Sequence, residues 1–161
     1  MNRQEITISI MNLYNYEWTY FNIKTKEDLK DSIKDFLKVN GDHDFEIQLI
    51  DSDYVGLNDN NLEKFLNLQE EFEEVDSQEI LYLIKALGVD EAAQTLKEEL
   101  FYIIVHEDNK IEAFREYITE YNMLDIPDHL ESYIDWESVL IDYECGGTTV
   151  KRVDTGIYLI K

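Results

Sequence analysis

The residues with the clearest potential for metal chemistry lie in a short acidic loop, residues 51–59. Its letters, DSDYVGLND, place Asp51, Asp53 and Asp59 at positions 1, 3 and 9 and a glycine at position 6, as in a calcium-binding loop. Such a loop also needs a side-chain oxygen at position 5 and a bidentate glutamate at position 12, where this chain has valine and leucine. We therefore predict no metal site here, and interpret the segment as a turn between a strand and a helix with a capping aspartate.

The single cysteine, Cys145, precedes two glycines and is the candidate for covalent chemistry. Acidic residues surround it in the sequence, which opposes the thiolate that a nucleophile needs. The histidines, His43, His106 and His129, form no close pair with one another or with the cysteine, so no zinc pattern is present. No phosphate-binding glycine loop and no GxSxG nucleophile motif occurs. The sequence predicts a protein that is not an enzyme and binds no cofactor or metal.

Net charge is the outlier of this sequence. Thirty-six Asp and Glu against 14 Lys and Arg give a formal net charge of −22 over 161 residues. A small domain carries a net charge of roughly 2–8 in magnitude, and a larger excess opposes compaction by self-repulsion. The segments 1–60, 61–100 and 101–161 hold 12, 11 and 13 acids against 6, 3 and 5 bases, so the excess is spread along the chain. General acidity and adaptation to high salt are the alternatives to a functional surface of fixed negative charge.

The composition predicts a folded and soluble protein. Hydrophobic residues make up 44% of the chain and aromatic residues 12%, whereas disordered acidic chains are poor in aromatic residues. One cysteine excludes an internal disulfide and fits a reducing compartment. No segment has the pattern of a signal peptide, and the apolar runs are too short to cross a bilayer. We therefore expect a cytoplasmic protein.

The first section, residues 1–58, is predicted to form a small β-sheet that carries one helix. The segments Glu5–Leu13, Trp18–Ile23 and Phe45–Ile50 have the alternation and β-branched or aromatic content of strands. Thr25 begins the intervening helix with a pattern similar to a capping box, and the letters NGD at 40–42 end it.

The second and third sections are predicted to differ from each other. Residues 59–100 show three helical patterns and no strand, with helix starts at Asp59 or Asn60, at Ser77 and at Asp90. Residues 101–161 predict a strand at 101–105, a helix at 110–122, and a helix whose first position is Pro127, with a break near Asp135 left open. A hairpin that turns at 154–156 closes the chain. The predicted fold class is α+β in three parts, with β-sheet-plus-helix sections at both ends and an all-helical middle.

Carboxylates spaced four residues apart on these helices would form rows on the surface. Glu70 with Glu74, and Glu112 with Glu116 and Glu120, lack the interleaved lysines of an ordinary solvated helix face, which remains the alternative. Duplex DNA carries about one charge per 1.7 Å of axis, so 22 net charges match roughly 37 Å of duplex. A protein that occupied a DNA-binding groove would need such an array. The carboxylates that we expect on this surface are Asp31, Asp35, Glu63, Glu70, Glu71, Glu74, Glu79, Glu112, Glu116, Glu120, Asp128 and Glu131.

The last third of the chain contains a distinctive pattern in residues 126–144, IPDHLESYIDWESVLIDYE: a proline, a leucine-containing turn, the letters YID before an aromatic residue, and an acidic helix. This pattern resembles the C-terminal signature of the ArdA antirestriction family. The strand and helix of 101–124 and the closing hairpin are also similar. Residues 1–58 are less similar, and the middle matches in composition. The first hairpin differs, because Tyr14-Asn15 continues through two residues into Trp18 where the family has glycines.

This resemblance implies an elongated, curved protein that imitates bent B-form DNA and blocks type I restriction-modification enzymes by occupying their DNA grooves. It also implies an origin in a mobile element or phage, and a homodimer paired through the C-terminal region, for which we expect Tyr133, Ile134, Trp136 and Val139 as interface residues. Direct binding of nucleic acid or of a membrane is not expected. The alternatives are an inhibitor of a CRISPR nuclease or another DNA-targeting defence complex, an acidic adaptor or chaperone for basic DNA-binding proteins, and a metal-dependent enzyme built on the 51–59 loop.

Overall fold

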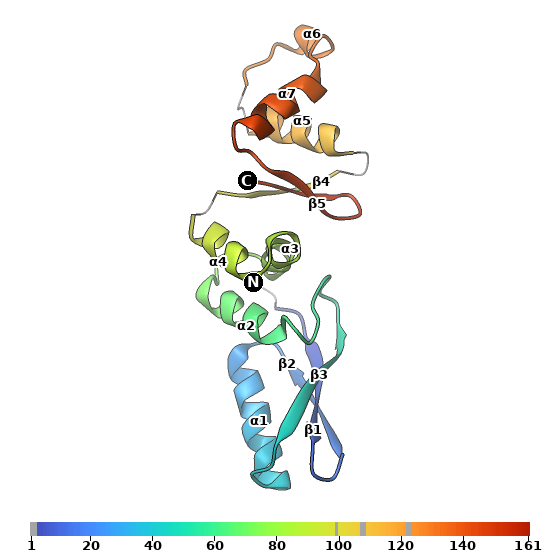
Figure 1. Cartoon of the computed structure of the whole chain (residues 1–161), viewed down its shortest axis with the longest axis vertical. Coiled ribbons are helices and arrows are strands. Elements are labelled where there is room, and N and C mark those ends of the chain that lie inside the picture. Colours follow the sequence, from blue (N-terminus) through green and yellow to red (C-terminus); the bar gives the residue numbers. More distant parts are fainter. Residues whose placement is uncertain (1–2, 99, 107–108, 122–123) are drawn as a thin grey trace.

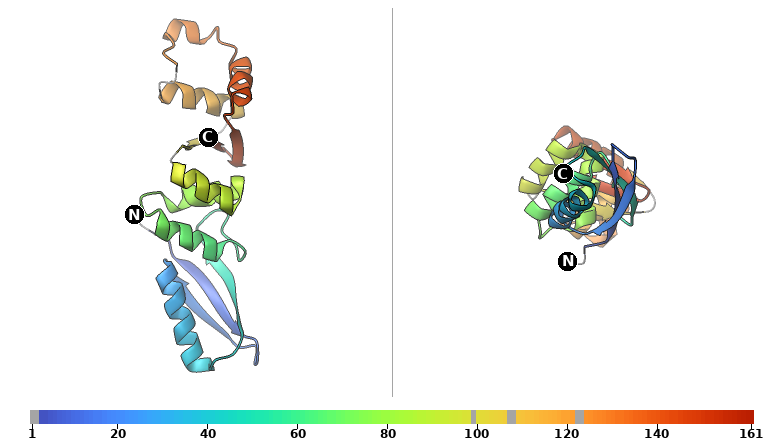
Figure 2. Two further views of the ribbon diagram at one scale, coloured as in Figure 1. Left: turned by 60° about the vertical axis from the view of Figure 1, so that its left-hand side comes forward. Right: turned by 90° about the horizontal axis from the view of Figure 1, so that it is seen from below.

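The computed structural model of the chain describes residues 3–98, 100–106, 109–121 and 124–161. These residues form seven helices and two three-stranded antiparallel sheets, which follow one another along a long axis (Figure 1). Figure 2 shows the same elongated shape after a turn about that axis, and a narrow cross-section from the end. Within the described residues, no helix has both the length and the apolar character needed to cross a membrane.

The first sheet and its helix confirm the prediction for the N-terminal section. Strands β1 (Ile6–Asn12), β2 (Trp18–Ile23) and β3 (Phe45–Ser52) pair in the order β2-β1-β3, and α1 (Lys26–Asn40) covers one face. The hydroxyl of Thr25 accepts the backbone N–H of Asp28 at 3.1 Å, and the Asp28 carboxylate accepts the N–H of Thr25 at 2.9 Å. This capping box starts α1 at the predicted residue. Gly41, at φ 80°, ends it in a conformation that favours glycine.

The helices of the middle section are α2 (Leu62–Glu71), α3 (Ser77–Leu87) and α4 (Val89–Glu98). Their predicted starts are wrong by one to a few residues. Asn61 precedes α2, while the side chain of Asp59 instead accepts the backbone N–H of Leu49 in the first sheet. The carboxylate of Asp76, rather than Ser77, caps α3, and Asp90 lies inside the first turn of α4. The side chain of a capping residue accepts the free N–H groups of the first helical turn, and several acids and amides here compete for that position.

The C-terminal section contains β4 (Tyr102–Val105), α5 (Lys110–Glu120), α6 (Asp128–Glu131), α7 (Trp136–Cys145), β5 (Val150–Asp154) and β6 (Ile157–Ile160). The strands pair in the order β4-β6-β5. Pro127 lies just before α6 instead of at its first position. The predicted long helix is broken at Asp135, whose carboxylate caps α7 by accepting the N–H of Ser138 at 3.2 Å.

The described residues form two hydrophobic cores, so the three-part description is only partly matched. No strand occurs among the described residues of 59–98, as predicted, but the helices there share one core with the first sheet. Phe65 and Leu83 lie in the same buried cluster as Ile8 of β1. The second core contains Phe114 of α5 and Trp136 of α7. Periodicity shows which side of an element is apolar but not what that side packs against.

The second sheet joins the two cores because both of its faces are covered. Along β6, Ile157 and Leu159 contact the first core, whereas Tyr158 and Ile160 belong to the second. This follows from the alternation of side chains along a strand. An ion pair of 2.7 Å between Lys85 of α3 and Asp154 of β5 fixes the same junction at the surface. The elongated molecule is therefore continuous from one core to the next.

Candidate acidic interaction surface

Positive charge is absent from four stretches of the sequence, and these stretches give the molecule its acidic surfaces. No Lys or Arg occurs in 4–23, 39–63, 65–84 or 116–150. The first two stretches contain the strands of the first sheet, the third contains most of α2 and α3, and the fourth contains the end of α5 with α6 and α7. The stretches are distributed over the whole length of the molecule (Figure 1).

The densest group of carboxylates lies in residues 70–76, the last two residues of α2 and the connection to α3, which we call the acidic turn. Helix α2 ends at Glu71 because Phe72 leaves the helical conformation (φ −120°, ψ 60°). Glu70 and Glu74 are therefore not the predicted helical row, since Glu74 belongs to the turn. The turn also exposes Glu73, which sequence reasoning did not select. The cation-free interval between Lys64 and Lys85 is the signal that would have identified it.

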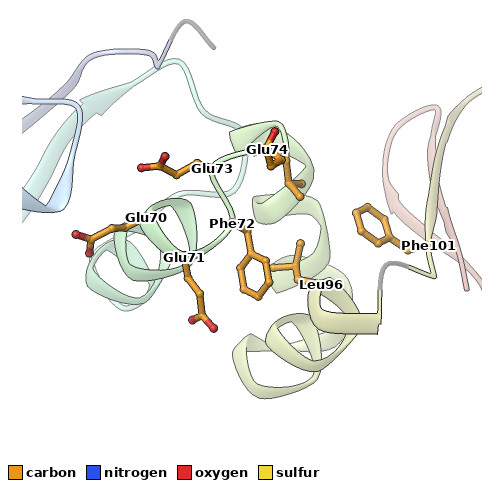
Figure 3. Close-up of a pocket in the computed structure, with 8 residues that line it drawn as sticks. Glu70, Glu71, Phe72, Glu73, Glu74, Leu96 and Phe101 are labelled. Carbon is orange, nitrogen blue, oxygen red and sulfur yellow. The ribbon is translucent and has the colours of Figure 1, made fainter.

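A hollow of about 620 Å³ opens beside the acidic turn (Figure 3). Its apolar lining comes from Phe72, Val75, Leu96 and Phe101, and its rim carries Glu70, Glu71, Glu73 and Glu74. An apolar floor with an anionic rim suits a side chain that has an alkyl stem and a cationic end, as lysine and arginine do. The arrangement can bind cations of a partner.

The glutamates of the turn interact only weakly with cations of the chain itself. Lys26 lies 3.3 Å from Glu70, Lys97 lies 3.9 Å from Glu71, and Arg3 lies 3.6 Å from Glu73. These glutamates are more than half exposed, and solvent-exposed pairs contribute about 0–1 kcal/mol. Within the described residues no ion pair involves Glu74. Cations of a partner can therefore compete for the turn at little cost.

The predicted acidic surface does not extend over α1. Asp31 pairs with Lys34 and Asp35 pairs with Lys38, both at 2.8 Å. The hydrogen bond to Asp31 raises the pKa of the Lys34 ammonium. Helix α1 holds four acids and four lysines, so its own charges cancel. Asp31 and Asp35 thus lie on an ordinary salt-bridged helix face, which differs from the expectation.

Glu79 and Glu63, two further predicted members, are placed differently from each other. Glu79 in α3 is only partly exposed, and burial, with a smaller effect of Asp76, raises the pKa of its carboxyl group. A half-buried carboxylate is a poor substitute for a hydrated phosphate. Glu63 is exposed in the first turn of α2, where a negative charge also interacts favourably with the helix dipole.

The three glutamates predicted as a row, Glu112, Glu116 and Glu120, all lie on one helix, α5 (Lys110–Glu120), where Glu112 and Glu116 are partly buried. Arg115 lies between them and donates from Nη1 to Glu112 at 3.1 Å and from Nε to Glu131 of α6 at 2.9 Å. The Glu131 hydrogen bond raises the pKa of the guanidinium. Arg115 thus fastens the short α6 to α5, a structural role that sequence reasoning missed.

The far end of the molecule, which we call the acidic cap, consists of residues 124–145. Its helices α6 and α7 contain no Lys or Arg, and the exposed carboxylates include Asp128, Glu137 and Asp142. Glu144 is held at 2.5 Å by Lys110 of α5. The cap therefore presents a second concentration of negative charge, remote from the acidic turn along the axis (Figure 1).

The expected dimer interface also lies in the cap, and only part of it faces solvent. Tyr133 is 84% exposed, whereas Trp136 is 9% exposed and belongs to the second core. Ile134 and Val139 are partly buried against the same core. Because Trp136 packs inside its own chain, we no longer expect it to contact a second copy. Leu130, at 46% exposure, lies near Tyr133 in the chain and extends the exposed apolar area.

The remaining chemical candidates are isolated. Among the described residues no group of three His, Cys, Asp or Glu side chains is placed to hold a metal ion. In the 51–59 loop, the carboxylate of Asp59 accepts a hydrogen bond from the backbone N–H of Leu49. Cys145 is an exposed free cysteine at the end of α7.

Comparison with known proteins identified no relationship. No family model matches the chain, and no curated protein matches it significantly. The resemblance of residues 101–161 to the ArdA family therefore stays a prediction that rests on the residues themselves.

Proposed function

We propose that this protein is a DNA mimic that inhibits a DNA-binding defence enzyme by occupying its DNA groove. The observation that carries the proposal is the absence of Lys and Arg from four long stretches of a folded, elongated chain. Proteins that bind DNA present lysines and arginines matched to phosphates and release counterions when they bind. A rigid object that displays carboxylates along one axis competes for those same cations.

The amount and arrangement of charge support this function. At the charge density of duplex DNA, 22 net charges correspond to roughly 37 Å of axis. The acidic turn and the acidic cap lie at separate positions along the axis, and α1, which is electrically balanced, contributes nothing to the net charge. An elongated carrier displays its charges as a line, which fits a groove better than a sphere of the same charge would.

The choice of target rests on the resemblance to the ArdA family. It favours a type I restriction-modification enzyme, and the interface predicted in the cap favours a homodimer as the inhibiting form. A CRISPR nuclease or another DNA-targeting defence complex presents the same kind of cationic groove and is the alternative target.

The proposal is tested by displacement of DNA. A fluorescent duplex bound to a purified type I restriction-modification enzyme is titrated with this protein, and anisotropy reports release of the duplex. We expect competitive release, with an apparent affinity that falls as the DNA concentration rises. A stable complex that contains enzyme, duplex and this protein together would reject the mimic.

A second titration distinguishes the acidic adaptor. The same duplex is bound to a small basic histone-like protein, which has positive charge but no groove of matched shape. Release from this complex at the same concentration of inhibitor would favour an adaptor for basic proteins. Release that requires much more inhibitor would support recognition of a groove.

A further inference from the structure

The outer face of the first sheet is a second surface of distinct chemistry. Helix α1 lies against one side of the sheet, and no helix of the described residues covers the other side (Figure 2). Two large aromatic side chains of β2 remain exposed there: Trp18 is 39% exposed and Tyr20 is 64% exposed. Exposed Trp and Tyr are enriched at protein interfaces, because each combines a large apolar face with a hydrogen-bonding group.

The strand register sets the side chains of this face in three rows across the sheet. The rows are Trp18–Met11–Glu46, Tyr20–Ser9–Gln48 and Asn22–Thr7–Asp51. In the last row Thr7 donates a hydrogen bond from Oγ1 to Oδ1 of Asn22 at 3.1 Å, so these side chains share one face. The first row therefore places an indole and a carboxylate on either side of a methionine.

The face carries negative charge and no positive charge. Residues 4–23 and 39–63 contain no Lys or Arg, and the lysines of this section lie in 24–38, in α1 and the residues just before it. Glu46 and Asp51 are exposed on the face. The charges of α1 cancel, so the section is polarised between a neutral helix side and an acidic, aromatic sheet side. Charge complementarity selects a cationic partner for the sheet side.

The centre of the face contains an unsatisfied polar atom. Ser9 is 1% exposed, and its Oγ has no hydrogen-bond partner. A buried hydroxyl without a partner costs stability, and a ligand that donates a hydrogen bond would relieve that cost. This atom lies between the flanking rows, in register with Tyr20 and Gln48.

We propose that this face docks arginine side chains of a protein partner. A guanidinium is planar, stacks on an indole or phenol ring, and donates to carboxylate and hydroxyl oxygens from its other edges. Trp18 and Glu46 belong to strands on either side of β1, two strand spacings apart, which is about 10 Å. A guanidinium that lies over Met11, the middle residue of this row, can therefore reach both the ring and the carboxylate. Phosphate mimicry needs no aromatic residue, so the aromatic side chains of this face add a separate means of recognition. The docking proposal is therefore independent of whether the protein displaces DNA.

The test uses the full chain labelled with ¹⁵N and a capped Arg-Gly-Arg peptide, with capped Lys-Gly-Lys as the matched cation. At about 0.15 M salt, the long-range attraction between the cationic peptides and the acidic protein is largely screened, so short-range contacts decide the binding. We expect chemical-shift changes on the Trp18 indole N–H and on the amides of Met11 and Glu46, larger for the arginine peptide. Equal changes for both peptides, or changes confined to α2 and α5, would overturn the proposal.

Substitutions distinguish binding at this face from a general effect of the protein's net charge. Trp18→Thr keeps a residue with strand propensity, and the loss of one stacked guanidinium should weaken binding about two- to fivefold. Glu27→Gln removes the same charge as Glu46→Gln but lies on α1, where its partner is Lys30. We expect Glu46→Gln to weaken the arginine peptide and Glu27→Gln to leave it unchanged. The amide shifts of buried β1 residues such as Ile8 and Ile10, in the same ¹⁵N spectra, report whether the first sheet of each variant remains folded. Equal effects of the two glutamine variants would contradict docking on this face.

Discussion

The carboxylates of the acidic turn, which we expect to contact the target, can be compared directly with those of α1, which pair with lysines of the same helix. The first variant combines Glu70→Gln, Glu71→Gln and Glu74→Gln in the turn. The second combines Glu27→Gln, Asp31→Asn and Asp35→Asn on α1, where each acid has a lysine three residues away. Both variants change the net charge by the same amount and remove only exposed ion pairs, so both should fold.

The expected effect follows from the salt dependence of phosphate-like contacts. Each charge matched by a cation of the target contributes about 0.9 to the slope of log affinity against log salt. Loss of three matched charges should lower the magnitude of the slope by about 2.7. A fourfold rise in salt weakens binding of both proteins, and the factor by which it weakens the turn variant should be about 40 times smaller than the factor for the parent protein. The α1 variant should keep the parent slope, because those acids face their own lysines.

The assay is displacement of a labelled duplex from the purified target enzyme at about 50 mM and about 200 mM salt. Single substitutions in the turn serve as intermediate points, and each should cost little. Equal salt slopes for the two triple variants would refute the acidic turn as a binding surface. Such a result would indicate that only the total charge of the protein matters. A single carboxylate substitution outside the turn that abolished inhibition, while the triple turn variant retained it, would indicate a discrete site instead.

Three further predictions concern stability and assembly. Because burial raises the pKa of Glu79 above its unfolded value, the native state binds more protons between those two values, and stability falls as pH rises through that window. Glu79→Gln should therefore raise the melting temperature at pH 7 and lose this advantage near pH 4. Leu159→Ala, at a fully buried position where the second sheet meets the first core, should cost about 3 kcal/mol in urea unfolding. Tyr133→Ser should weaken self-association in sedimentation and leave the emission of Trp136 unchanged; a parent protein that is monomeric at micromolar concentration would contradict the dimer.

Local patterns predicted the elements well where one residue type had one physical role. The capping box at Thr25 and the positive-φ glycine at 41 fixed both ends of α1 from the sequence. The break at Asp135 was left open, because the letters around it are compatible with a continued helix and the aspartate could equally have faced solvent. No glycine or proline marks the end of α2 at Glu71, and Phe72 packs against the first core, a tertiary contact that the local sequence does not reveal.

The composition of the candidate surface could be predicted, but its arrangement could not. The gaps between Lys38 and Lys64, between Lys64 and Lys85, and between Arg115 and Lys151 are visible in the sequence. What required coordinates is the pairing between elements: Lys110 with Glu144, and Arg115 with Glu131, each bring together residues far apart in the chain. The burial of Trp136 was missed for the same reason, because an aromatic residue among acids fits a core and an interface equally well.

The distribution of charge also explains how a chain with a net charge of −22 remains folded. Among the described residues, the buried polar side chains are only Ser, Asn, Gln and Thr, so no carboxylate is fully buried. The repulsion between carboxylates therefore acts through solvent, where salt screens it over about 10 Å at 0.1 M. The same screening opposes attachment to a cationic groove. Rising salt should thus stabilise the fold and any self-association of this protein while it weakens the complex with its target. These two opposite dependences separate a folded DNA mimic from a protein that is acidic for solubility alone, because only the mimic has a complex for salt to weaken.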